Sequence, residues 1–229
     1  MFALFGLALT VGCAVDNMTV APLVATQSTE FPSQTATALP TEISFPTATA
    51  LSAAIPSPTP GIVIMIDDFE GVQTVWTVCV DPESTDSSAL NAALTADHAS
   101  QGKKALQLNF DKNDRPKAVF YLPKMMDLST GGAVRFDLFN PGTADGVGFA
   151  LTTGPDSIWC ESDSFPVAEG KTTTLTFDLT AVNFKAAATN WEFRLPLANL
   201  DYVARLSIIV NPKTAGAVQG DNLYLAVSA

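Results

Sequence analysis

Apolar and polar residues alternate in short runs from Gly61 to the end of the chain. A period of two puts successive side chains on opposite faces of a strand, so each such run predicts a half-buried β-strand. In the run over residues 105–110, one face holds Leu106, Leu108 and Phe110 and the other holds Gln107 and Asn109. No run of ten or more residues shows the period of an amphipathic helix. The pattern therefore restricts this region to all-β architectures.

The alternating runs predict strands separated by Gly-, Pro- and Asn-containing turns such as Asn140-Pro141-Gly142. The predicted strands are Gly61–Phe69, Ala105–Phe110, Ala118–Leu122, Ala133–Asn140, Val147–Thr152, Ser157–Glu161, Thr173–Leu179, Ala204–Val210 and Asn222–Ser228. Regularly spaced short strands are typical of two antiparallel sheets packed face to face. We therefore expect residues 61–229 to form one β-sandwich, most simply a jelly roll.

The chain begins with apolar or small residues, 1–12, followed at once by Cys13. A helix of this length rises about 18 Å, less than the roughly 30 Å of a bilayer's hydrocarbon core, so an export signal fits better than a spanning helix. The order Leu9-Thr10-Val11-Gly12-Cys13 resembles a bacterial lipobox, although no Lys or Arg precedes it and Thr10 replaces the usual leucine. The resemblance implies lipidation of Cys13 and an exported, surface-anchored protein. An ordinary cleaved signal and a buried apolar segment are the alternatives.

Residues 14–60 have a different composition, rich in Thr, Ala, Ser and Pro, without Gly, Lys or Arg. Seven prolines prevent a helix or a central strand from running through this segment. Too few large apolar residues are present to offset the entropy of ordering. We expect a disordered, extended spacer.

The formal net charge of −11 bears on the partners of the protein. An acidic chain repels phosphate backbones, so nucleic-acid binding is disfavoured. Metal cations and neutral ligands are compatible with this charge, and we expect a monomer.

Five segments in order resemble one family of domains. They are Ile66–Gly71 (IDDFEG), Trp76, Gly102–Leu106, Val134–Asn140 and Gly220–Val227 (GDNLYLAV). Together they are similar to the galactose-binding-like jelly-roll carbohydrate-binding modules appended to polysaccharide-degrading enzymes. The resemblance implies polysaccharide binding without catalysis, and it implies a structural calcium ion.

Sugar binding needs aromatic rings for the C–H face of a pyranose and fixed polar groups for its hydroxyls. Eight outward-facing residues are candidates, expected to form one composite surface. They are Trp159, Glu161, Arg135, Asp137, Phe139, Tyr121, Gln107 and Asn109. The alternative is that the two larger rings cap a core edge and that Arg135 merely pairs with Asp137.

Acidic residues near both ends of the domain are candidate calcium ligands, because calcium takes six to eight oxygens. They are Asp67, Asp68, Glu70 and Asp221. Solvated turn acids are the alternative. Cys79 and Cys160 are expected to pair as a disulfide in an exported protein, with two buried thiols as the alternative.

Catalytic motifs are weak in this chain. It has one histidine and lacks GxSxG, HExxH and phosphate-loop patterns. Glu161 and Glu192 are the acids closest to tryptophans, but their spacing does not force them together at the distances that glycoside hydrolysis requires. We therefore predict a non-catalytic protein, with a surface adhesion domain and a small glycan-active enzyme as alternatives.

Overall fold

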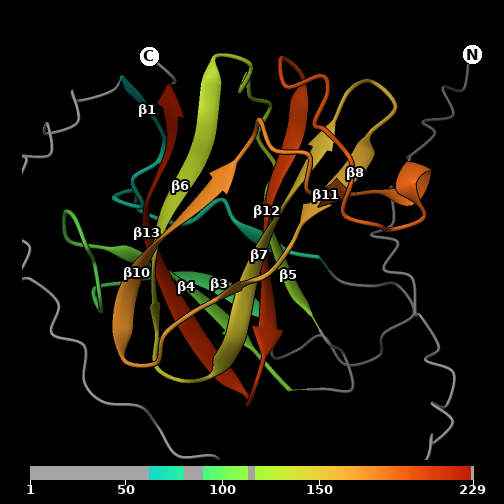
Figure 1. The fold of residues 1–229 in the computed structure, drawn as a ribbon. Coiled ribbons are helices and arrows are strands. Elements are labelled where there is room, and N and C mark those ends of the chain that lie inside the picture. Colours follow the sequence, from blue (N-terminus) through green and yellow to red (C-terminus); the bar gives the residue numbers. More distant parts are fainter. Residues whose placement is uncertain (1–61, 80–89, 113–116, 228–229) are drawn as a thin grey trace, which may run out of the picture. The chain divides into compact units, whose positions relative to one another are not determined.

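The structure, a computed structural model, describes residues 62–79, 90–112 and 117–227, which form two antiparallel sheets (Figure 1). The predicted leader with Cys13 and the predicted spacer over residues 14–60 lie outside the described residues. In the described ranges no helix is long and apolar enough to cross a membrane.

Sheet A contains the first and the last strand of the domain. Its path runs β10(Lys171–Asp178), β6(Gly131–Asn140), β13(Gly216–Val227), β4(Ala105–Phe110), β3(Asn91–Thr95), and β1(Val63–Asp67) also pairs with β13. The two terminal strands of the sandwich are therefore neighbours (Figure 1).

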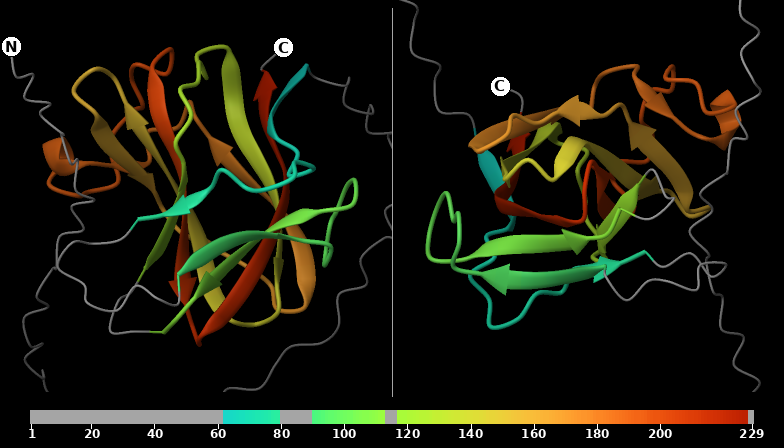
Figure 2. Two further views of the ribbon diagram at one scale, coloured as in Figure 1. Left: turned by 180° about the vertical axis from the view of Figure 1, so that it is seen from behind. Right: turned by 90° about the horizontal axis from the view of Figure 1, so that it is seen from below.

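Sheet B is built from the remaining strands. Its path runs β11(Phe184–Lys185), β8(Ile158–Ser162), β7(Ala144–Thr153), β12(Val203–Pro212), β5(Ala118–Leu122), β2(Thr77–Val78), and β9(Phe165–Pro166) also pairs with β7. A short 3-10 turn, η1(Ala187–Thr189), follows β11 at the edge of this sheet (Figure 2).

The apolar faces of the two sheets meet in one core. Phe136 comes from sheet A and Phe149 from sheet B, and each is about 1% exposed. Burying one such side chain stabilises the fold by roughly 2 kcal/mol. A Cβ on Gly220 would lie 1.8 Å from the Phe136 ring, so only glycine allows this approach of β13 to the core.

The predicted all-β sandwich is confirmed, and each predicted strand is present with ends that differ by a few residues. The sequence pattern did not predict β3 or the two-residue strands β2, β9 and β11. Alanines with low strand propensity fill the centre of β3, and two residues are too few to show a period.

Candidate functional site

The eight predicted ligand-binding residues lie on the outer faces of different sheets. Tyr121, Trp159 and Glu161 belong to sheet B. Sheet A holds Gln107, Asn109, Arg135, Asp137 and Phe139. The expectation of one composite surface is wrong, because alternation shows which side of a strand faces outward but not which sheet the strand joins.

One row of side chains crosses the outer face of sheet B in register. The pairing of β5, β12, β7, β8 and β11 aligns Tyr121, Ser207, Ala150, Glu161 and Lys185. Small side chains occupy the middle of the row, while an aromatic ring and charged groups stand at its sides. A surface of this kind offers a ring for stacking beside hydrogen-bonding groups.

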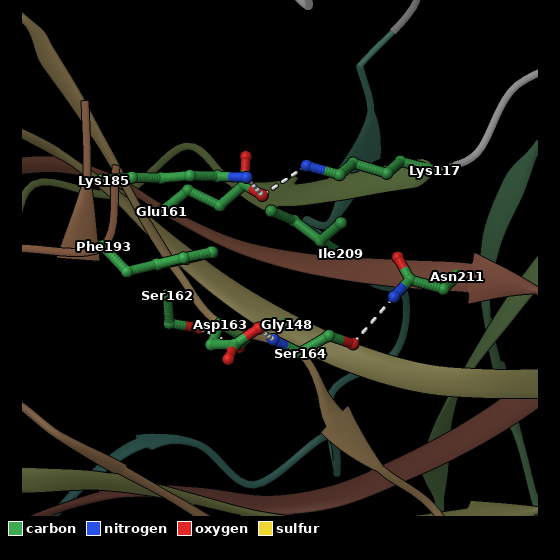
Figure 3. Close-up of a pocket in the computed structure, with 10 residues that line it drawn as sticks. All are labelled: Lys117, Gly148, Glu161, Ser162, Asp163, Ser164, Lys185, Phe193, Ile209 and Asn211. Carbon is green, nitrogen blue, oxygen red and sulfur yellow. Dashed lines mark hydrogen bonds and ion pairs between the residues drawn. The ribbon is translucent and has the colours of Figure 1, made fainter. Parts of the chain in front are cut away.

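Glu161 is a buried carboxylate, only 7% exposed. Its Oε1 atom accepts a hydrogen bond from the ammonium group of Lys117, and the Nζ of Lys185 lies 3.1 Å from the same oxygen (Figure 3). A buried charge is tolerated when opposite charges and hydrogen bonds compensate its lost hydration. The two lysines supply that compensation.

A shallow hollow of about 190 Å³ opens around this carboxylate. Its lining residues are Lys117, Gly148, Glu161, Ser162, Asp163, Ser164, Lys185, Phe193, Ile209 and Asn211 (Figure 3). Phe193 is 43% exposed, and the Nζ of Lys185 lies 4.7 Å from its ring centre. Sequence reasoning missed Lys117, Lys185 and Phe193. The one sequence signal that could have indicated this side of the hollow is an aromatic residue, Phe193, within the charged segment 191–194.

Trp159 and Tyr121 are half-buried and lie outside the main core. Both pack against an apolar patch on the outer side of sheet B that includes Val119 and Ile209. The guanidinium of Arg205 lies 4.9 Å from the centre of the Tyr121 ring. The rings are thus held in place while part of each stays accessible.

On sheet A the outward polar groups bind one another. Asp137 accepts hydrogen bonds from Ser100 Oγ at 2.8 Å, Thr174 Oγ1 at 2.6 Å and Asn222 Nδ2 at 3.2 Å. It forms no ion pair with the exposed Arg135 in this described strand, so the alternative pairing of these two residues is not observed.

The amides and the ring of the same face are also engaged. Gln107 Nε2 donates to Asn109 Oδ1 at 2.8 Å. His98 stacks on Phe139 with ring centres 3.5 Å apart. The outer face of sheet A therefore offers a ligand fewer unbonded polar groups and less accessible ring surface than the outer face of sheet B.

Two of the predicted calcium ligands, Asp67 and Asp221, accept hydrogen bonds from N–H groups. The oxygens of Asp67 receive the backbone N–H of Phe69 and the indole N–H of Trp76, both at 2.9 Å. One oxygen of Asp221 receives the backbone N–H groups of Ser100 and Gln101, both at 2.7 Å.

The other two predicted ligands, Asp68 and Glu70, line one hollow of about 280 Å³ together with Asp221. Backbone N–H groups of Lys103 and Lys104 donate to Glu70 and lower its carboxyl pKa. Within the described residues no three acidic, cysteine or histidine side chains form a metal-binding group. The side chains alone thus do not assemble the six to eight oxygens of a calcium site.

The predicted Cys79–Cys160 disulfide is wrong, because Cys160 is a free, buried thiol. Cys160 is opposite Leu151 and shares its inward face, whereas Cys79 packs with Val119 on the outer face of sheet B. Burial raises the pKa of the Cys160 thiol, which keeps it protonated at neutral pH.

Residues 67–190 match the family model described as "Mannanase, galactose-binding domain-like". No curated protein matches the chain.

Among solved structures, the family 11 carbohydrate-binding module of Clostridium thermocellum, in complex with a β-1,3-1,4-mixed-linked tetrasaccharide, is similar. The TM-score is 0.54 at 16% identity, covering 72% of this chain and 96% of that one. An exo-β-agarase matches with a TM-score of 0.56 at 15% identity, over 72% of this chain and 25% of that one. At these identities the likeness shows the fold.

Proposed function

The chain belongs to the family of mannanase galactose-binding-like domains, and on this premise we propose that its sandwich binds polysaccharide without cleaving it. The outer face of sheet B is the binding surface. The observation that carries this proposal is that Trp159, Tyr121 and the buried Glu161 share that face.

The mechanism is stacking combined with hydrogen bonding on a rigid sheet. The rings of Trp159, Tyr121 and Phe193 offer apolar surface to the C–H faces of sugar rings. Glu161 and Asn211 offer polar atoms to the hydroxyls and fix the orientation of the sugar. Neighbouring strands already hold these groups in place, so little ordering entropy is lost on binding.

The proteins that this chain resembles support the ligand class that we propose. The module of Clostridium thermocellum is described in complex with a mixed-linked β-glucan fragment, and the matched family model is named after mannanases. We propose a neutral β-linked polysaccharide, bound by a monomer.

The test is a polysaccharide screen with the full-length protein, in which β-mannan and mixed-linkage β-1,3-1,4-glucan are presented in affinity gels. We expect retardation by at least one of them and its loss in Trp159→Ala. Phe139→Ala is the matched control, because this ring lies on sheet A, and it keeps the retardation. If no polysaccharide retards the protein, the proposed function is wrong.

Two other outcomes identify the alternative functions. Capture of a cell-surface protein without any glycan binding supports an adhesion domain. Release of reducing sugar that is lost in Glu161→Gln supports an enzyme. The structure gives the enzyme little support, since Glu161 is bound by two lysines and Glu192 is exposed and pairs with Arg194 at 3.2 Å.

We propose that the protein is exported and that Cys13 carries a lipid, with residues 14–60 as the spacer. Cys13→Ser should then release the protein from the membrane fraction, and unchanged fractionation would exclude the anchor.

We propose that the calcium ion implied by the family resemblance binds at Asp67, Asp68, Glu70 and Asp221, of which the last three line one hollow. Bound calcium stabilises the folded state by mass action. Chelation by EDTA should therefore lower the melting temperature, and no change would exclude the ion.

A further inference from the structure

The two lysines at Glu161 contact the same carboxylate oxygen. Lys117 and Lys185 both bind Oε1, and no described residue donates to Oε2. A carboxylate oxygen accepts about two hydrogen bonds, so with respect to the described residues Oε2 keeps its full capacity. Within the described part of the chain, the lysines bind one oxygen of this carboxylate and the other has no donor.

The lysines reach the carboxylate from opposite directions along the same face of sheet B. Lys117 immediately precedes β5, Lys185 lies on β11, and Glu161 on β8 extends between them (Figure 3). The Nζ of Lys185 also lies over the ring of Phe193. Neither ammonium group is the strongly exposed cation of an ordinary surface lysine, since their side chains are 25% and 18% exposed.

The formal charges of the residues that line the hollow sum to zero. Lys117 and Lys185 carry two positive charges, and Glu161 and Asp163 carry two negative ones. An acidic sugar would meet no surplus of positive charge here, and it would place its carboxylate beside the free oxygen of Glu161. A neutral sugar hydroxyl, in contrast, donates a charge-assisted hydrogen bond to that oxygen and brings no like charge next to it.

From this geometry we propose that Lys117 and Lys185 are positioning residues that hold Glu161 so that its Oε2 accepts a sugar hydroxyl. The arrangement selects neutral over acidic polysaccharides. This inference rests on the proposed function, and it assigns the lysines an indirect role, through Glu161, instead of a contact with the glycan.

The test is a double-mutant cycle on affinity in the full-length protein, with β-mannan and mixed-linkage β-glucan as neutral probes and polygalacturonate as the acidic one. Glu161→Gln, Lys117→Met and Lys185→Met should each weaken neutral binding about tenfold, the scale of one hydrogen bond to a charged group. In the Glu161→Gln background, either lysine change should add less than about twofold, because the residues act as one unit.

Two controls separate positioning from general damage. Lys185→Arg keeps the positive charge and should retain affinity within about threefold, and Lys171→Met removes an exposed lysine of sheet A and should change nothing. Melting temperatures of all variants show which remain folded.

Three results would overturn the inference. The first is that the lysine changes weaken binding equally with and without Glu161, which means that the lysines contact the glycan. The second is tighter binding of polygalacturonate than of the neutral probes. The third is unchanged neutral binding in both lysine variants. If the wild-type protein binds none of the probes, the proposed function itself fails, which is a distinct outcome.

Discussion

The outer faces of the two sheets carry similar residue types but differ in what those residues contact. On sheet A, Asp137 is held by three hydrogen-bond donors and Phe139 is covered by His98. On sheet B, Trp159 and Tyr121 stay half-buried, and one oxygen of Glu161 receives no donor from any residue that the structure describes. An outward polar residue is therefore a candidate for ligand binding only where its hydrogen-bonding capacity is not already used.

The buried carboxylates of the two sheets show the same contrast. Asp221 on sheet A is 2% exposed and is bound mainly by backbone N–H groups of Ser100 and Gln101, which tie a loop to the sheet. Glu161 on sheet B is bound by two lysine side chains. We infer that the first carboxylate serves stability and the second serves recognition.

The largest expected effect in this comparison is on stability. Asp221→Ala removes the acceptor of two backbone N–H groups and should lower the free energy of unfolding by about 3 kcal/mol. Chemical denaturation measures this loss, with Asp156→Ala in an exposed turn as control. Glycan affinity of the folded variant should not change, and a tenfold weakening would assign the ligand to sheet A.

A smaller effect is expected on the affinity for the glycan. It is measured by comparing alanine variants of two half-buried tyrosines, one on each sheet. Tyr121→Ala on sheet B removes a stacking ring and should cost about 1.4 kcal/mol of binding, roughly tenfold. Tyr224→Ala on sheet A should stay within about twofold. Isothermal titration with the polysaccharide from the screen measures both, and equal losses would remove the distinction between the faces.

The smallest effect concerns Glu70 beside sheet A. Backbone N–H donors lower its pKa below the ordinary 4.5, so its contribution to stability is present above that pH and is lost as the pH falls through the folded-state pKa. The stability difference between wild type and Glu70→Gln should be constant at neutral pH and shrink below about pH 4.5. Since the group is exposed, salt should weaken the effect.

Denaturation curves across pH measure this difference. A difference that grows toward acid pH would contradict the assigned sign. Affinity at neutral pH should be the same for both proteins, because Glu70 lies away from the face of sheet B.

How much of the molecule the sequence predicts depends on the range of the interaction. Alternation within β8 correctly placed Trp159 and Glu161 on one face, since this relation is local. The contact of Lys117 with Glu161 joins residues 44 apart and exists because β5 and β8 belong to the same sheet. No local pattern encodes that strand order, which is also why the ligand set was wrongly merged and Cys79 wrongly paired with Cys160.

The most direct test of the binding surface is a titration of the ¹⁵N-labelled full-length protein with an oligosaccharide of the retained polysaccharide, followed by backbone amide shifts. We expect the shifts to cluster in residues 148–164, 185–193 and 205–211, which carry the outer face of sheet B. Shifts clustered instead in residues 91–109, 135–139 and 172–176 would place the ligand on sheet A and would contradict the proposed binding surface.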